Sequence, residues 1–347
     1  MNNIITLSGD PGSGKSTVRD SLKAKFEMHG KTVKIYCVGD IFRQLAEEKG
    51  MTVTEFNKML EKKNTNVDEQ LDLAVAKFGE KIERENNPNI IYIIDSRMAW
   101  KNIPNAYKVK LTVTDRIAGE RIFNDRTRGK EDQYNSLEET IIETKVRKKS
   151  EKERYFELYG EDITDDKNFD ININTAFVSP EDIADVIIEN MSENRQNKGL
   201  IWASPKLFLP TQAMGDTIHT FSDLQNSIKQ EGFQLRGAPT AMKKGNMYWI
   251  LDGHHRNFAA ASVGINIIPY TIYENMDEKE EYTINEQIGI LEDTLGINYR
   301  SVLYTYEEAW RNHETRVLTY GYEKAYPGIY GLQQDVNIKR KSQDDGR

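Results

Sequence analysis

The sequence has little cysteine and no long apolar run, and these absences exclude several classes of protein. The single cysteine, Cys37, excludes a disulfide within the chain and a thiolate metal cluster, and it fits a reducing compartment. No apolar run reaches the length of about 18 residues that would span a bilayer, and the first residues lack a basic start and a small-residue cleavage site. We therefore expect no membrane span and a cytoplasmic location, which for a viral chain is the host cytoplasm.

The sequence also lacks an excess of basic residues. Its net charge of −8 argues against a bulk electrostatic grip on nucleic acid, so any DNA contact must be local. Hydrophobic residues make up 38% and charged residues 29% of the chain, a balance typical of folded globular domains. At 347 residues the chain is long enough for two such domains.

In residues 1–192, short apolar runs alternate with segments whose apolar residues recur at helical spacing. Val18, Leu22 and Phe26 recur at helical spacing directly after the first apolar run. This alternation predicts an α/β domain with a doubly wound parallel sheet. The expected strands are residues 4–8, 33–37, 90–94, 108–113 and 170–174, and further helices are expected near 41–49, 67–86, 115–126, 136–158 and 180–191.

The sequence after residue 192 predicts a separate, smaller domain. A polar stretch over residues 193–199 has no apolar anchor and is interpreted as a linker. Residues 200–275 hold short strands punctuated by glycine and proline, which indicates an α+β domain. We expect a helical extension over 276–332 and a disordered tail over 333–347.

The first apolar run leads into a phosphate-binding loop. The loop has the required pattern and lies between a predicted strand and a predicted helix, and it consists of Gly9, Asp10, Pro11, Gly12, Ser13, Gly14, Lys15, Ser16 and Thr17. Backbone N–H groups and the helix N-terminus would surround the phosphates of ATP. Lys15 would reach the β and γ phosphates, and Ser16 would bind Mg²⁺. Asp95 ends an apolar strand, where it would hold the same metal through water.

Further short motifs in the first half of the chain point to a particular family. They occur in the following order: Gly39-Asp40-Ile41-Phe42-Arg43, Gly50-Met51, Glu55-Phe56, Asp95-Ser96-Arg97, Glu153-Arg154-Tyr155 and Tyr159-Gly160. Through them residues 1–190 resemble the archaeal-type cytidylate kinases, whose fold is that of the P-loop nucleoside monophosphate kinases. The resemblance implies an acceptor phosphate site formed by Asp40, Arg43 and Arg97, and it places Arg121, Arg126 and Arg154 toward the transferring phosphoryl group. Ser96 departs from the family's Asp-Gly-Arg and adds a side chain beside the acceptor.

A second motif lies in the C-terminal half. Asp252, Gly253, His254, His255 and Arg256 form a turn that opens a predicted helix. With the segments around it, this turn resembles the ParB/sulfiredoxin-like fold, in which the turn binds nucleotide phosphates. The paired histidines have no further ligand cluster in view, so we expect a phosphate contact, chiefly through Arg256, rather than a metal site.

These resemblances imply an ATP- and Mg²⁺-dependent kinase acting on a pyrimidine nucleotide. P-loop kinases of bacterial viruses that phosphorylate 5-hydroxymethyluracil in DNA, a step in thymidine hypermodification, resemble nucleotide kinases in the same way, and a fused ParB-like domain favours an acceptor in DNA. A free pyrimidine nucleoside monophosphate such as CMP or dCMP is the alternative. A nucleotide-gated DNA-binding protein, and a bifunctional enzyme whose second domain resembles free serine kinases, are two further hypotheses.

Overall fold

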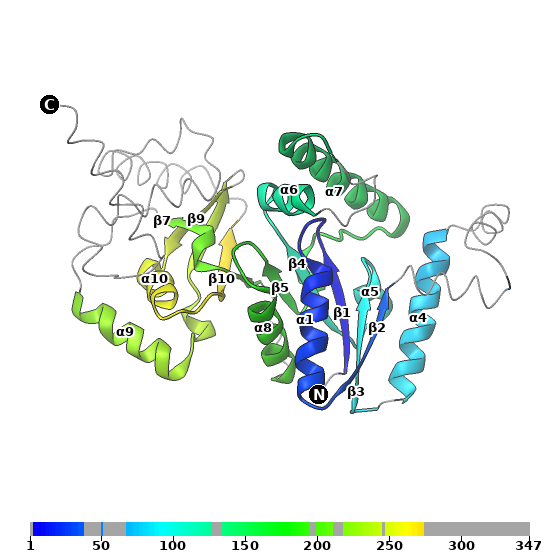
Figure 1. The fold of residues 1–347 in the computed structure, drawn as a ribbon, viewed down its shortest axis with the longest axis horizontal. Coiled ribbons are helices and arrows are strands. Elements are labelled where there is room, and N and C mark those ends of the chain that lie inside the picture. Colours follow the sequence, from blue (N-terminus) through cyan, green and yellow to red (C-terminus); the bar gives the residue numbers. More distant parts are fainter. Residues whose placement is uncertain are drawn as a thin grey trace. The chain divides into compact units, whose positions relative to one another are not determined.

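The chain divides into two compact units, residues 1–175 with 179–199 and residues 176–178 with 200–347. The computed structural model describes residues 3–37, 50, 67–85, 87–125, 134–193, 199–210, 218–244 and 247–273 (Figure 1). The expected helix over 41–49, the middle of the linker, the helical extension over 276–332 and the tail over 333–347 lie outside these residues.

A parallel sheet forms the centre of the first unit. Its strand order is β2-β3-β1-β4-β5, and all neighbouring pairs are parallel. The strands are β1 (Ile4–Gly9), β2 (Thr32–Cys37), β3 (Ile90–Asp95), β4 (Tyr107–Thr112) and β5 (Ile171–Asn174). The expected parallel sheet is therefore confirmed. Strands β1, β3, β4 and β5 are largely buried, whereas β2, at the end of the strand order, is exposed or half-buried.

The described helices of the first unit are α1 (Lys15–Met28), α4 (Val67–Glu85), α5 (Ala99–Asn102), α6 (Asp115–Asn124), α7 (Leu137–Tyr159) and α8 (Pro180–Ser192). All were expected from the sequence except the short α5. The Ser136 hydroxyl caps α7 by accepting from the N–H of Glu139, and Ser179 caps α8 in the same way from Asp182. Helices α1 and α8 lie side by side (Figure 1), and α6 packs on α7. Within the described ranges, no helix is both long and apolar enough to cross a membrane.

Both faces of this sheet carry apolar side chains. On one face Ile4, Tyr92 and Ile94 pack with Val75 of α4 and Ala99 of α5. The alternate strand residues, such as Ile5 and Leu7, are also fully buried, as are the inward positions of α1. Because the strands are parallel, their carboxyl ends meet at a single edge of the sheet, where the phosphate-binding loop lies.

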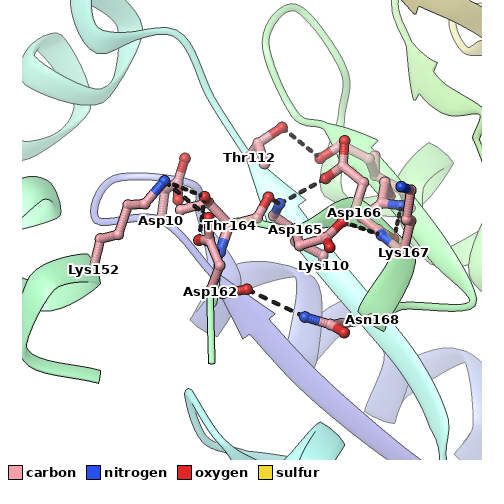
Figure 2. Close-up of polar contacts among 12 residues, drawn as sticks. Asp10, Lys110, Thr112, Lys152, Asp162, Thr164, Asp165, Asp166, Lys167 and Asn168 are labelled. Carbon is pink, nitrogen blue, oxygen red and sulfur yellow. Dashed lines mark hydrogen bonds and ion pairs between the residues drawn. The ribbon is translucent and has the colours of Figure 1, made fainter. Parts of the chain in front are cut away.

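One row of side chains across the sheet is polar. The register aligns Ser8, Lys110 and Asn172 on neighbouring strands β1, β4 and β5. Lys110 is 6% exposed, and its Nζ donates to the Thr164 carbonyl and to Asp166 Oδ1, each at 2.6 Å (Figure 2). Asn172 Nδ2 donates to the Asp166 carbonyl at 2.9 Å. The turn that connects α7 to β5 is thus anchored by a buried cation.

The described residues of the second unit form a mixed sheet and two α-helices. Its strand order is β6-β10-β8-β9-β7, in which the β6/β10 and β8/β9 pairs are antiparallel and the β10/β8 and β7/β9 pairs are parallel. The elements are β6 (Ile201–Ala203), β7 (Phe208–Pro210), α9 (Ile218–Glu231), β8 (Thr240–Lys244), β9 (Met247–Asp252), α10 (His254–Ser262) and β10 (Ile268–Tyr273). Phe208 stacks on Tyr270 in its core, with ring centroids 3.8 Å apart. The described part of this unit is a small α+β arrangement.

The buried Lys110 yields a prediction about stability. Asp166→Ala should lower the free energy of unfolding by about 1–3 kcal/mol, because it leaves a desolvated ammonium without its carboxylate, while the partial exposure of Asp166 keeps the loss below that of a fully buried pair. Urea unfolding followed by circular dichroism measures the change. Glu161→Ala, which removes the surface ion pair of 3.1 Å with Lys101, is the matched control and should cost less than about 0.5 kcal/mol. Equal losses in the two variants would contradict the anchoring role of Lys110.

Candidate active site

The segment between β1 and α1 is a tight loop that glycine makes possible. Gly12 and Gly14 adopt the left-handed region, with φ of 75° and 76°. A Cβ on Gly12 would lie 2.8 Å from the Ala118 Cα of α6, so only glycine fits there. The N–H of Asp10 donates to the Leu111 carbonyl at 2.9 Å, which fastens the loop to β4. The loop leads directly into the N-terminus of α1, a geometry suited to phosphate.

Lys15 and Asp95 meet beside this loop. β3 is the neighbour of β1, and its register places Asp95 opposite Leu7, just before the loop. Lys15 Nζ forms an ion pair with Asp95 Oδ1, and Arg19 Nη1 lies 3.6 Å from Asp95 Oδ2. Arg19 Nη1 also donates to Cys37 Sγ at 3.5 Å. The structure therefore brings together two residues that are far apart in the sequence, of which Lys15 was predicted to reach the β and γ phosphates and Asp95 to hold the magnesium ion through water.

The residues around Lys15 fit a magnesium ion. Ser16 occupies the first turn of α1, and Asp95 ends the strand beside it, so both offer oxygen atoms. In the part of the chain that the structure describes, no three His, Cys, Asp or Glu side chains converge to hold a metal by themselves. Mg²⁺ commonly takes one or two protein oxygens and completes its shell with phosphate and water. Ser16 and Asp95 would hold it beside the loop.

Arg97, which the sequence predicts to bind the acceptor phosphate, lies directly after β3. Its Nη2 lies 2.9 Å from Glu151 Oε2 of α7, and Arg147 Nε donates to the other Glu151 oxygen at 3.2 Å. Ser96 is buried, and its hydroxyl accepts from the N–H of Met98 at 3.2 Å. The extra side chain at Ser96 thus turns into the backbone. Asp40 and Arg43, the other acceptor residues expected from the sequence, lie outside the described residues.

The three predicted catalytic arginines lie in different settings. Arg121 of α6 is half-buried against the phosphate-binding loop, where it donates to the Gly12 carbonyl and to Thr175. Burial lowers the pKa of its guanidinium. Arg154 of α7 lies over the ring of Tyr155, 5.0 Å from the centroid. Arg126 lies outside the described residues.

Three further residues at this site were not predicted from the sequence. Lys148 Nζ of α7 forms an ion pair of 2.6 Å with Asp10 of the loop. Thr175, which follows β5, donates its hydroxyl to the Ser13 carbonyl at 2.9 Å. Glu151 forms ion pairs with both Arg97 and Arg147. Two features of the sequence could have indicated these residues: Lys148 and Glu151 are spaced to lie on one helix face, and Thr175 is a polar residue at the carboxyl end of a strand.

The second predicted motif forms the start of α10. Gly253 precedes the helix with φ 86°, and a Cβ there would lie 2.9 Å from Pro239 Cβ. Arg256 Nη2 lies 2.7 Å from Asp252, and its Nη1 donates to the Gly237 carbonyl at 2.8 Å. The guanidinium expected to bind a phosphate therefore ties the turn to the segment before β8. His254 is buried, and His255 is half-buried beside it.

His254 makes the second unit sensitive to acid. Burial, with a smaller contribution from His255 and against an opposing effect of Asp252, lowers the pKa of His254 to about 4 from its ordinary value of 6.5. The unfolded chain then binds the extra proton between these values, so stability is full above pH 6.5 and falls as the pH drops toward 4. We expect a loss of about 3 kcal/mol from this group. Hydrogen exchange of the α10 amides across this range measures it.

His254→Gln should flatten that pH dependence. His29→Gln, at an exposed histidine that follows α1, should leave the exchange of the α10 amides unchanged. An unchanged acid response in His254→Gln would assign the loss to other groups.

Comparison with known proteins agrees with the geometry of the loop. A family model described as an AAA domain matches residues 5–143. The cytidylate kinase of Sulfolobus acidocaldarius is 32% identical over 199 residues, which cover 56% of this chain and 98% of that kinase. The cytidylate kinase of Methanocella arvoryzae is 31% identical over 190 residues, which cover 55% of this chain and 97% of that kinase.

A longer relative shares the same region. A protein of Lacinutrix mariniflava named S-adenosylmethionine-dependent nucleotide dehydratase is 32% identical over 195 residues, which cover 56% of this chain but only 37% of that protein. The similarity in each of the three relatives thus extends over about half of the present chain. The first half of the chain belongs to the cytidylate kinase family of P-loop kinases, which use ATP with magnesium.

Proposed function

We propose that the protein transfers the γ-phosphoryl group of ATP to a pyrimidine nucleotide. The observation that carries this proposal is the pairing of the phosphate-binding loop with Asp95 and Arg97 of the neighbouring strand end. This juxtaposition supplies a donor site and a cation for an acceptor phosphate at one edge of the sheet. The cytidylate kinases that match almost end to end support a pyrimidine acceptor.

The reaction requires positioning and charge compensation more than covalent chemistry. Lys15 would neutralise charge on the β and γ oxygens, and Arg97 would hold the acceptor phosphate in line with the γ-phosphoryl group. Both cations are paired with carboxylates in the structure, Lys15 with Asp95 and Arg97 with Glu151. Anionic substrates would replace these carboxylates as partners of the two cations. Mg²⁺ would then compensate Asp95, and Arg147 would remain the partner of Glu151.

The setting of Ser96 supports an acceptor of the family's usual kind. Because its hydroxyl is engaged by the N–H of Met98, this side chain adds little bulk toward an acceptor beside Arg97. A free pyrimidine nucleoside monophosphate such as CMP or dCMP is therefore the acceptor that the described geometry favours.

The second compact unit favours a related function, phosphorylation of 5-hydroxymethyluracil within DNA. A kinase for free nucleotides has no evident need for such a unit, whereas a kinase acting on a polymer could use it to hold the polymer. In this version the second unit, proposed to be ParB/sulfiredoxin-like, would bind nucleotide or DNA near Asp252 to Arg256. Arg97 would then hold a phosphate that flanks the modified base.

An acceptor panel separates these functions. The full-length chain is supplied with labelled ATP, Mg²⁺ and one acceptor at a time: CMP, dCMP, UMP, DNA containing 5-hydroxymethyluracil, or serine. Label in a free nucleotide establishes a nucleotide kinase, and label in DNA establishes the base kinase. Label in serine as well would reveal a second active site. Slow ATP hydrolysis with no labelled acceptor would overturn the proposal in favour of a nucleotide-gated binding protein.

Arg97→Ala gives a prediction specific to the acceptor side. The KM for the labelled acceptor should rise by about ten- to a hundredfold, because a charge-assisted contact to its phosphate is lost, and the KM for ATP should change little. Arg84→Ala, which removes an exposed ion pair of 3.1 Å on α4, is the control and should match the wild type. A parallel rise in the KM for ATP would exclude a role confined to the acceptor.

A further inference from the structure

The phosphate-binding loop is held in place by a small network of hydrogen bonds from Thr175 and Arg121. Thr175 is 1% exposed, and its hydroxyl donates to the Ser13 carbonyl at 2.9 Å. Arg121 Nη1 donates to Thr175 Oγ1 at 2.9 Å and to the Gly12 carbonyl at 3.3 Å, and its Nη2 donates to the Thr175 carbonyl at 2.8 Å. The Thr175 N–H in turn donates to the Thr112 carbonyl at 2.9 Å. Two strand ends and α6 are therefore linked to consecutive loop carbonyls.

These contacts decide which way the loop peptides face. In a trans peptide the C=O and the following N–H point in opposite directions. The Ser13 carbonyl points toward Thr175, so the N–H of Gly14 is directed to the opposite side. The neighbouring peptide is fixed at both of its ends, because the Ser13 N–H donates to the Asp10 carbonyl at 3.1 Å and the Gly12 carbonyl accepts from Arg121. The network therefore sets the orientation of the amide directly before α1.

The charge of Arg121 is compensated in an unusual way. No carboxylate of the described residues forms an ion pair with it, and its guanidinium is bonded to carbonyl and hydroxyl oxygens. A desolvated cation without a counter-charge is costly. The same guanidinium lies 3.7 Å from the position that a Cβ on Gly14 would take, at the start of the phosphate-binding helix. Its positive charge is thus placed to favour an anion in the loop.

We propose that Thr175 and Arg121 are positioning residues for ATP, which act by orienting the Ser13–Gly14 peptide toward the phosphates. Arg121 then works through the loop backbone rather than by touching the transferring phosphoryl group, as the sequence had suggested. This inference rests on the proposed kinase function, because it assigns a role within the ATP site. The closing experiment therefore measures ATP binding apart from acceptor chemistry.

Thr175→Val is the most direct test, since it keeps the shape of the side chain and removes the hydroxyl. The Kd and KM for ATP should rise about tenfold or more, with the KM for the acceptor unchanged. Thr175→Ser keeps the hydroxyl and should stay within about threefold of the wild type. Thr6→Val is the matched control, because the buried hydroxyl of Thr6 has no hydrogen-bond partner among the described residues, and its ATP affinity should be unchanged.

Arg121→Lys provides an independent test of the positioning role if Thr175→Val does not fold. A lysine keeps the charge but cannot bond to the Gly12 carbonyl and to both Thr175 oxygens through a planar fork, so the Kd for ATP should rise about tenfold while circular dichroism shows a folded chain. Wild-type ATP affinity in the folded Thr175→Val variant, or in Arg121→Lys where the valine variant is unfolded, would overturn the inference. Failure of the wild-type chain itself to bind ATP would instead overturn the proposed function.

Discussion

The ion pair between Lys15 and Asp95 shows the constraint on which this site depends. A kinase must gather several cations at one sheet edge, and clustered cations repel one another and are costly to desolvate. The chain meets this constraint by pairing cations with carboxylates: Asp95 with Lys15 and Arg19, Asp10 with Lys148, and Glu151 with Arg97 and Arg147. Arg121 instead donates to the Gly12 carbonyl and to the two oxygens of Thr175. The site can therefore form before any nucleotide is bound.

Helix α7 contacts both the phosphate-binding loop and Arg97, the residue proposed to hold the acceptor phosphate. Lys148 contacts Asp10 of the phosphate-binding loop, and Glu151, about one turn further along, contacts Arg97 beside β3. Each of these pairs involves a group that a phosphate would approach. Binding of a phosphate at either side would thus change the charge environment of the same helix. This shared element gives a physical reason for the two substrates to influence each other.

The sequence was sufficient to predict what local patterns determine. Apolar runs predicted the five parallel strands, and the glycine spacing predicted a phosphate-binding loop whose left-handed Gly12 and Gly14 the structure shows. The Lys148–Asp10, Thr175–Ser13 and Glu151–Arg97 contacts were not predicted, because each joins residues separated by 54 to 162 positions. Lys110 was also missed, since a lysine in an apolar strand reveals its buried partner only once the following turn is placed.

Arg256 shows a different limit of sequence reasoning. The motif placed it correctly at the start of a helix, but its planar fork is used within the turn, on Asp252 and the Gly237 carbonyl. A motif identifies which residue types are present, whereas their hydrogen-bond partners depend on segments that are distant in the sequence. The acceptor preference of the kinase is therefore better judged from the residues near Arg97 than from the second unit alone.

The most direct test of the central claim is transfer of labelled γ-phosphate from ATP to the acceptor by the Lys15→Ala variant. The account predicts a loss of about 100-fold or more in kcat with a folded chain, because the charge that compensates the β and γ oxygens is removed. Lys23→Ala, on the same helix at a side chain that is 46% exposed, should keep wild-type transfer. Undiminished transfer by the Lys15→Ala variant would contradict the claim that this loop holds the phosphoryl donor.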